Sequence, residues 1–224
     1  MHYTNQKIAE IKGIIFDMDG LLFDTERLYL KAWPPTGEIM GIPITEEVAR
    51  KTIALGGYEM EEIFQAHYGL DFTLEKARPV IRQWITDYVA EHGLPVRPGA
   101  REAIAFFHKR GFPLAIGSSN LHHVVVAYLE EAGLLSYFST IVTGDMVERV
   151  KPAPDIFLQA AANLGLRPEE CLVFEDSPPG IEAAHKAGCV PIMVPDLLEP
   201  CDVTRDRCWQ IFSSLEGVPQ RLFD

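Results

Sequence analysis

Two aspartates separated by a single residue follow a short apolar segment near the N-terminus. The segment Gly13–Phe16 is rich in β-branched residues and runs into Asp17–Gly20. This pattern predicts a buried strand that ends in a polar loop. In an extended strand Asp17 and Asp19 would point to opposite faces, but a turn at Asp19 can bring both carboxylates to one site. One carboxylate could then attack phosphorus while the other donates or accepts a proton.

Further groups suited to phosphate chemistry follow later apolar segments. Ser118, with nearby backbone N–H groups, can hold phosphate oxygens, and Lys151 can neutralise charge on a transferring group. Glu175 and Asp176 can complete an oxygen-rich site of the kind that magnesium prefers. Because carboxylates repel an anionic phosphate, a divalent cation is expected between them.

The elements that must position these groups alternate along the chain. The predicted strands are Gly13–Phe16, Pro113–Gly117, Thr140–Val142, Cys171–Phe174 and Val190–Val194. The helices predicted between them are Gly99–Arg110, His123–Ala132, Pro154–Leu164 and Pro178–Ala187. Strands that alternate with helices predict an α/β fold with a doubly wound parallel sheet. Ligands bind beyond the carboxyl ends of such strands, which is where the polar groups lie.

The stretch from Asp24 to Pro95 lacks a clear strand. Its helical patterns cover Thr45–Thr52, Tyr58–Tyr68 and Leu74–His92, with glycines between them. We therefore expect a helical insertion, residues 24–95, within a core formed by residues 1–23 and 96–224. Trp33 lies early in this insertion, and packing is the favoured interpretation over substrate contact.

Composition excludes several classes of protein. The 224 residues carry a formal net charge of -12, which argues against nucleic-acid binding and against an anionic membrane surface. The four cysteines show no CxxC spacing, so neither a zinc site nor a redox motif is indicated. The N-terminal segment is polar, unlike a signal peptide, and a cytoplasmic location is expected.

Four short motifs, taken in order, resemble those of the haloacid dehalogenase (HAD) superfamily. They are Asp17–Gly20, Ser118–Ser119, Lys151–Pro152 and Glu175–Asp176. The surrounding residues resemble the branch that contains β-phosphoglucomutase and the phosphatases of sugar phosphates and pseudouridine phosphate. The resemblance implies a Rossmann-like core, a helical cap and dependence on Mg²⁺.

The resemblance also implies roles for individual residues. Asp17 would be the nucleophile that forms an aspartyl-phosphate, and Asp19 the general acid and base. The implied phosphate-binding residues are Ser118, Ser119 and Lys151. The implied metal ligands are Asp17, Asp19 through its backbone carbonyl, Asp176 and, assisting, Glu175.

Two departures from this branch bear on the reaction. β-Phosphoglucomutase-type enzymes carry a histidine where Tyr29 matches, and an arginine that holds a second phosphate where Glu59 matches. Both departures favour hydrolysis over the alternative, a phosphomutase. A third departure, Pro34-Pro35, falls inside the first cap helix and predicts a break or kink there.

The leading hypothesis is therefore a magnesium-dependent phosphatase that hydrolyses a small sugar phosphate or nucleoside monophosphate as a monomer. A non-catalytic binding protein on the same scaffold is disfavoured because the catalytic set is intact: Asp17, Asp19, Ser118, Lys151 and Asp176. A dehalogenase is disfavoured because such relatives lack the second aspartate.

Overall fold

The computed structural model describes residues 9–53 and 55–223. Residues 1–8, Ala54 and Asp224 lie outside the described part, and so does most of the polar N-terminal segment discussed above. The chain divides into two compact units. One consists of Met1–Phe23 with Val96–Asp224, and the other of Asp24–Pro95.

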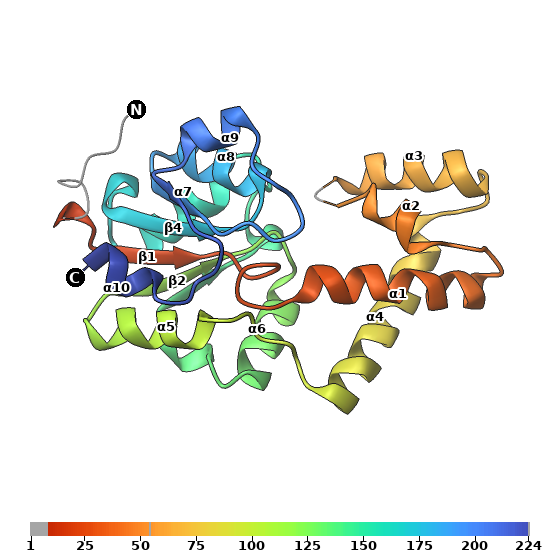
Figure 1. The fold of residues 1–224 in the computed structure, drawn as a ribbon, viewed down its shortest axis with the longest axis horizontal. Helices are drawn as coiled ribbons and strands as arrows, with labels where there is room; N and C mark the ends of the chain where they lie inside the picture. The colour runs from red at the N-terminus through yellow and green to blue at the C-terminus, as the bar shows by residue number, and fades with distance from the viewer. Residues whose placement is uncertain (1–8, 54, 224) are drawn as a thin grey trace. The chain divides into compact units, whose positions relative to one another are not determined.

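The first unit is built on a parallel sheet in the strand order β3-β2-β1-β4-β5-β6 (Figure 1). The strands are β1 (Gly13–Phe16), β2 (Leu114–Gly117), β3 (Thr140–Val142), β4 (Cys171–Glu175), β5 (Val190–Met193) and β6 (Gln210–Ile211). Five of them lie where apolar segments were predicted, and the α/β fold is confirmed. The two-residue strand β6 was missed because so short a segment shows no periodicity.

Helices cover both faces of the sheet (Figure 1). One face carries α5 (Ala100–Lys109), α6 (His122–Glu131) and α10 (Val218–Phe223). The other carries α7 (Asp155–Asn163), α8 (Pro178–Ala187) and α9 (Asp202–Arg207). Short 3₁₀ turns complete the unit: η2 (Leu135–Tyr137), η3 (Gly144–Met146) and η4 (Pro168–Glu170).

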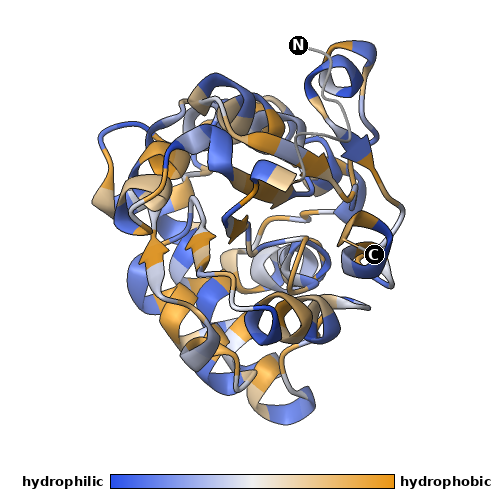
Figure 2. Cartoon of the chain, turned by 90° about the vertical axis from the view of Figure 1, so that its left-hand side faces the viewer, coloured by the Kyte–Doolittle hydropathy of each residue, from blue (hydrophilic) through white to orange (hydrophobic). Residues whose placement is uncertain are grey.

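Alternating side chains of the central strands fill two different cores. Ile15 belongs to a buried cluster that includes Val173 of β4, Phe157 of α7 and Ala184 of α8. Its neighbour Phe16 stacks on Phe174, with ring centroids 5.2 Å apart, and meets Phe107 of α5. Each fully buried side chain of this size stabilises the fold by about 1.5–3 kcal/mol. The strands are accordingly coloured largely as hydrophobic, whereas the helices carry hydrophobic and hydrophilic stretches in turn (Figure 2).

The topology indicates which end of this sheet binds ligands. β1 pairs in parallel with β2 on one side and with β4 on the other. The chain therefore reverses its direction of winding at β1, and ligands of such sheets bind beyond the carboxyl ends of the strands at this switch point.

The second unit is helical. It consists of α1 (Thr25–Met40), α2 (Glu46–Arg50), α3 (Gly57–Tyr68) and α4 (Leu74–His92). Trp33 is 3% exposed and packs against Phe64, with ring centroids 4.3 Å apart, and against Phe72. The packing interpretation of Trp33 is therefore confirmed.

A break or kink was expected at Pro34-Pro35, and the break is wrong, since α1 spans Thr25–Met40 with both prolines inside it. Each proline removes a backbone donor, at a cost of roughly 3 kcal/mol in a helix interior. The helix nevertheless buries Leu28, Ala32 and Trp33, and it packs along α4. Tertiary packing thus offsets the local cost.

Among the described residues, no helix is both long enough and apolar enough to cross a membrane.

Candidate active site

The carboxyl end of β1 delivers Asp17 into a buried setting. The N–H group of Asp17 donates to the carbonyl of Phe174 at 2.9 Å, and the residue is 5% exposed. The chain then turns at Gly20, whose φ is 77°. A Cβ atom on Gly20 would lie 2.3 Å from Oδ2 of Asp176. Glycine thus satisfies both the left-handed backbone and the close approach of the Asp176 carboxylate.

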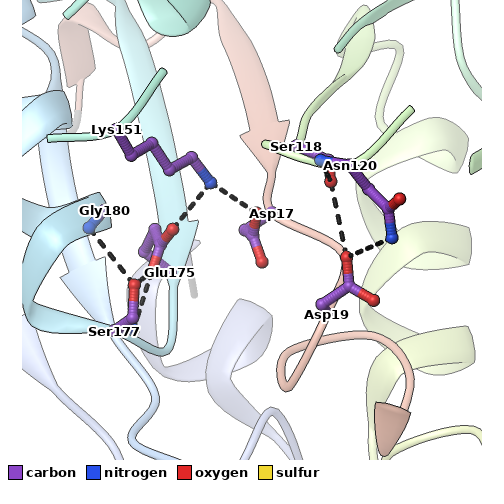
Figure 3. Close-up of polar contacts among 8 residues, drawn as sticks. All are labelled: Asp17, Asp19, Ser118, Asn120, Lys151, Glu175, Ser177 and Gly180. Atoms are coloured by element: carbon purple, nitrogen blue, oxygen red, sulfur yellow. Dashed lines mark hydrogen bonds and ion pairs between the residues drawn. The ribbon is translucent and has the colours of Figure 1, made fainter. Parts of the chain in front are cut away.

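Lys151 lies between two buried carboxylates (Figure 3). Its Nζ donates to Oδ1 of Asp17 and, at 2.7 Å, to Oε1 of Glu175. The side chains of Lys151, Asp17 and Glu175 are only 7%, 7% and 1% exposed. The ammonium group is therefore held within reach of any group bound to Asp17.

Glu175 is fixed by the start of α8. Ser177 caps this helix, and its backbone N–H and hydroxyl donate to Oε2 of Glu175 at 2.7 and 2.9 Å. The N–H of Gly180 in turn donates to the Ser177 hydroxyl at 3.2 Å (Figure 3). A Cβ atom on Gly180 would lie 1.7 Å from Oε1 of Glu175. A side chain at position 180 would therefore displace the carboxylate that holds Lys151.

The buried charges of Asp17 and Lys151 shift each other's pKa values. Burial raises the pKa of Asp17 well above its ordinary range; the Lys151 ammonium opposes this effect, and the charges of Glu175 and Asp19 add to it. Burial acts to lower the pKa of Lys151, but the carboxylates of Asp17 and Glu175 outweigh it and raise that pKa. The two carboxylates therefore favour the ammonium form of Lys151, and a further cation near Asp17 would favour the ionised form of Asp17.

The loop after β2 reaches the carboxylate of Asp19 (Figure 3). Oδ2 of Asp19 accepts from the hydroxyl of Ser118 at 3.5 Å and from Nδ2 of Asn120 at 3.3 Å. Ser118 is 1% exposed, whereas Ser119 beside it is exposed. The structure thus brings Ser118 to the site, and the side-chain role expected for Ser119 stays a prediction.

Three buried carboxylates form a cluster that suits a hard cation. Oxygen atoms of Asp17, Glu175 and Asp176 all lie within 4.8 Å of one another. All-oxygen sets of this kind match the ligand preference of Mg²⁺. The carboxylate of Asp19 is instead turned toward Ser118 and Asn120, which agrees with a role that leaves its side chain outside the metal set.

Sequence reasoning missed three residues of this arrangement. Asn120 follows the predicted serine pair directly, so its amide could have been added to the expected donors. Ser177 before Pro178 is a helix-start signal that indicates a cap. Gly180 stands inside a predicted helix, where a glycine costs about 1 kcal/mol relative to alanine and so invites a search for a packing reason.

Comparison with known proteins agrees with this geometry. A family model described as haloacid dehalogenase-like hydrolase matches residues 11–188, which contain all four motifs. Among curated proteins, the Thermotoga maritima phosphorylated carbohydrates phosphatase is 34% identical over 178 residues, covering 80% of this chain and 82% of that protein. The Escherichia coli fructose-1-phosphate phosphatase YqaB is 36% identical over 184 residues, covering 79% of this chain and 92% of that protein.

A solved structure extends the match to the whole fold. The chain superposes on the crystal structure of a putative β-phosphoglucomutase from T. maritima with a TM-score of 0.80 and 30% identity, covering 95% of this chain and 98% of that one. The chain therefore belongs to the haloacid dehalogenase-like hydrolases, as a phosphatase of the branch that includes β-phosphoglucomutases and sugar phosphatases.

Proposed function

We propose that this protein hydrolyses a small sugar phosphate through an aspartyl-phosphate on Asp17. The observation that carries the proposal is the position of Asp17 between two different partners. On one side, the ammonium group of Lys151 donates a hydrogen bond to Oδ1 of Asp17 (Figure 3). On the other side lies Asp19, whose carboxylate accepts hydrogen bonds from Ser118 and Asn120. A nucleophile, a fixed cation and a second carboxylate together suit phosphoryl transfer through a covalent intermediate.

In the first step a carboxylate oxygen of Asp17 attacks phosphorus. The bond between phosphorus and the sugar oxygen breaks, and protonated Asp19 gives its proton to the leaving oxygen. The sugar departs as an alcohol, and the phosphoryl group stays on Asp17. Lys151 lies close enough to Asp17 to offset the charge that builds up on the phosphoryl oxygens.

In the second step water attacks the same phosphorus atom. Asp19, now ionised, accepts a proton from this water, and the bond between phosphorus and Asp17 breaks. Inorganic phosphate leaves, and both aspartates return to their starting protonation states. The hydroxyl of Ser118 and the amide of Asn120 orient Asp19 in the resting protein.

The carboxylates of Asp17, Glu175 and Asp176 would hold Mg²⁺. When bound, the cation supplies charge neutralisation that lets an anionic phosphate approach an anionic nucleophile. The role of the Asp19 carbonyl as a further ligand belongs to the same proposal.

The names of the curated relatives support the proposal that the substrate is a sugar phosphate. Two of the most similar are named for phosphorylated carbohydrates and for fructose 1-phosphate. We take sugar phosphates as the first class to test and nucleoside monophosphates as the second. The cytoplasmic location and the monomeric state expected from the sequence stay predictions.

Glu59, which stands where the mutases carry a phosphate-binding arginine, favours hydrolysis over mutase activity. Its Oε2 accepts from the N–H of Gly56 at 3.0 Å and so caps the start of α3. A carboxylate in this position repels a second phosphate. Tyr29 stands where the mutases carry a histidine, the side-chain type that ordinarily changes its charge near neutral pH. We therefore expect the phosphoenzyme to be lost readily to water.

The test is a panel of sugar phosphates and nucleoside monophosphates with Mg²⁺, scored for released phosphate and for isomerised sugar phosphate. The panel includes β-glucose 1-phosphate with a trace of the 1,6-bisphosphate. We expect phosphate release to exceed formation of glucose 6-phosphate. Faster formation of glucose 6-phosphate would replace the phosphatase by the mutase.

A further inference from the structure

The loop that carries Ser118 and Asn120 leads into α6 without a cap of its own. The residue at the N-cap position is Leu121, and its side chain makes no capping hydrogen bond. The first N–H groups of a helix need acceptors from outside the helix. Here the N–H of His122 donates to Oδ1 of Asp145 at 3.1 Å. The acceptor thus comes from a residue 23 positions later, in η3 after the neighbouring strand β3.

Asp145 is itself held in place. The same Oδ1 accepts from the hydroxyl of Thr143 at 2.6 Å. This hydrogen bond lowers the pKa of Asp145, with a further contribution from the N–H of His122, so the side chain is a carboxylate at neutral pH. Thr143 is fully buried, and the acceptor is therefore anchored to the end of β3.

Gly144 continues this contact along the backbone. Its N–H donates to the carbonyl of Asn120 at 3.0 Å. A Cβ atom on Gly144 would lie 2.4 Å from the carbonyl oxygen of Ser119 and 3.0 Å from its carbon. These are backbone atoms, so a side chain at position 144 would push the loop itself rather than a flexible side chain.

The two loops are therefore joined by three hydrogen bonds. Ser118 donates from its N–H to the carbonyl of Val142 at 3.0 Å, Asn120 accepts from Gly144, and His122 donates to Asp145. The contacts from Ser118 and Asn120 to Asp19 are 3.5 and 3.3 Å long, which is longer than the usual hydrogen-bond distances. A displacement of the loop by a few tenths of an ångström would thus alter them.

We propose that Asp145 and Gly144 are positioning residues of the phosphate site. They set the backbone from Ser118 to His122 so that the Ser118 hydroxyl and the Asn120 amide point at the reacting centre. Neither residue is proposed to contact the substrate. The inference rests on the proposed function, because it assigns the loop to phosphate binding.

The experiment compares Asp145→Ala, Asp145→Asn and Gly144→Ala with the wild-type protein. The first readout is the dissociation constant of inorganic phosphate, measured by calorimetry with Mg²⁺ present. The second is kcat and KM with the best substrate of the panel. We expect Asp145→Ala and Gly144→Ala to weaken phosphate binding about tenfold and to lower kcat/KM roughly ten- to a hundredfold, the scale of a slightly misplaced group.

Asp145→Asn is the informative conservative change. Its amide oxygen can accept from both Thr143 and His122, as the carboxylate does. We expect it to keep phosphate binding and kcat/KM within about threefold of the wild-type values. A role of the negative charge alone would make Asp145→Asn as poor as Asp145→Ala, which would overturn the positioning role.

Glu170→Ala is the matched control. Glu170 also accepts a backbone N–H, that of Arg167 at 3.0 Å, but it precedes β4 and so lies at the amino end of the sheet, away from the site. We expect Glu170→Ala to lower the melting temperature without changing phosphate binding. Equal weakening in Glu170→Ala and Asp145→Ala would show a general effect of stability and overturn the proposal.

The two readouts separate this inference from the proposed function. If the wild-type protein binds phosphate but hydrolyses nothing in the panel, the proposed function fails and the binding series still tests the loop. Unchanged phosphate binding in both Asp145→Ala and Gly144→Ala would overturn the inference while leaving the hydrolase intact. Should Asp145→Ala fail to fold, Gly144→Ala alone decides the outcome.

Discussion

The ammonium group of Lys151 lies 2.7 Å from Oε1 of Glu175, and both side chains are almost excluded from solvent. Asp17 shares the same ammonium group. Removing one partner of a buried pair leaves a charge without compensation, which costs about 3–5 kcal/mol, whereas removing both can be nearly neutral. Single and double variants of Lys151 and Glu175 can therefore separate the contribution of this pair to stability from its contribution to activity.

Lys151→Met should abolish phosphate release and destabilise the protein strongly, because Asp17 and Glu175 then face each other unpaired. The double variant Lys151→Met/Glu175→Gln should recover part of the stability and none of the activity. Urea unfolding and a phosphate-release assay check both expectations. Recovery of activity in the double variant would show that Lys151 only balances Glu175.

Phosphate release should require a divalent cation, with Mg²⁺ preferred over Ca²⁺. The oxygen atoms of Asp17, Glu175 and Asp176 lie within 4.8 Å of one another, and Mg²⁺ demands shorter distances and fewer ligands than Ca²⁺. Calorimetry should show Mg²⁺ binding to the wild-type protein and at least tenfold weaker binding to Asp176→Ala. Full activity in excess chelator would contradict this prediction.

Gly20→Ala should impair the site beyond its cost in backbone strain. Gly20 and Gly41 both have positive φ, 77° and 70°, so alanine costs about 1–2 kcal/mol at either position. A Cβ atom at Gly20 would meet Asp176 at 2.3 Å, whereas at Gly41 it would meet nothing within 4 Å. We therefore expect both variants to have a lower melting temperature than the wild-type protein. Only Gly20→Ala should also lower the rate of phosphate release, roughly tenfold or more.

Equal activity of Gly20→Ala and Gly41→Ala would show that the Asp176 carboxylate can move without consequence.

The ion pair between Lys12 and Glu170 should make the stability of the protein depend on pH in the acid range. The Lys12 ammonium, followed by the N–H and side chain of Arg167, lowers the pKa of Glu170 to about 2. Because the folded pKa is depressed, the stabilisation is present above the ordinary pKa of 4.5 and is lost as pH falls toward 2. Glu170→Gln should melt a few degrees lower than the wild-type protein at pH 7, roughly the scale of one such contact.

At pH 2 the difference between Glu170→Gln and the wild-type protein should disappear. A difference of constant size from pH 7 to pH 2 would assign the effect to packing rather than to charge.

The sequence was most informative where a local pattern and the fold agree. The apolar run before Asp17 is buried on both sides, because its successive residues Ile15 and Phe16 face two separate cores, and it predicted β1 for that reason. The helix pattern of Leu74–His92 predicted α4 with the bounds that the structure has. Parallel strands share one carboxyl end, and so the polar groups after each strand could be assigned to a common site.

Contacts between segments far apart in the sequence could not be predicted from the sequence. Asp145 gives no local sign that it accepts from His122, because that contact depends on the neighbouring positions of β2 and β3. The unbroken helix across Pro34-Pro35 depends likewise on packing against α4, which propensity alone does not contain. Local rules therefore predicted the groups at the site and not the contacts that orient them.

The central claim is that Asp17 is the nucleophile, and its most direct test is the rate of phosphate release by Asp17→Asn. The amide is nearly isosteric with the carboxylate and should fold, since burial already disfavours the charged form of Asp17. An amide oxygen is a far weaker nucleophile toward phosphorus. With Mg²⁺ and the best substrate of the panel, we predict a loss of roughly 10³-fold or more in kcat. A folded Asp17→Asn protein that keeps kcat within about tenfold of wild type would contradict the account.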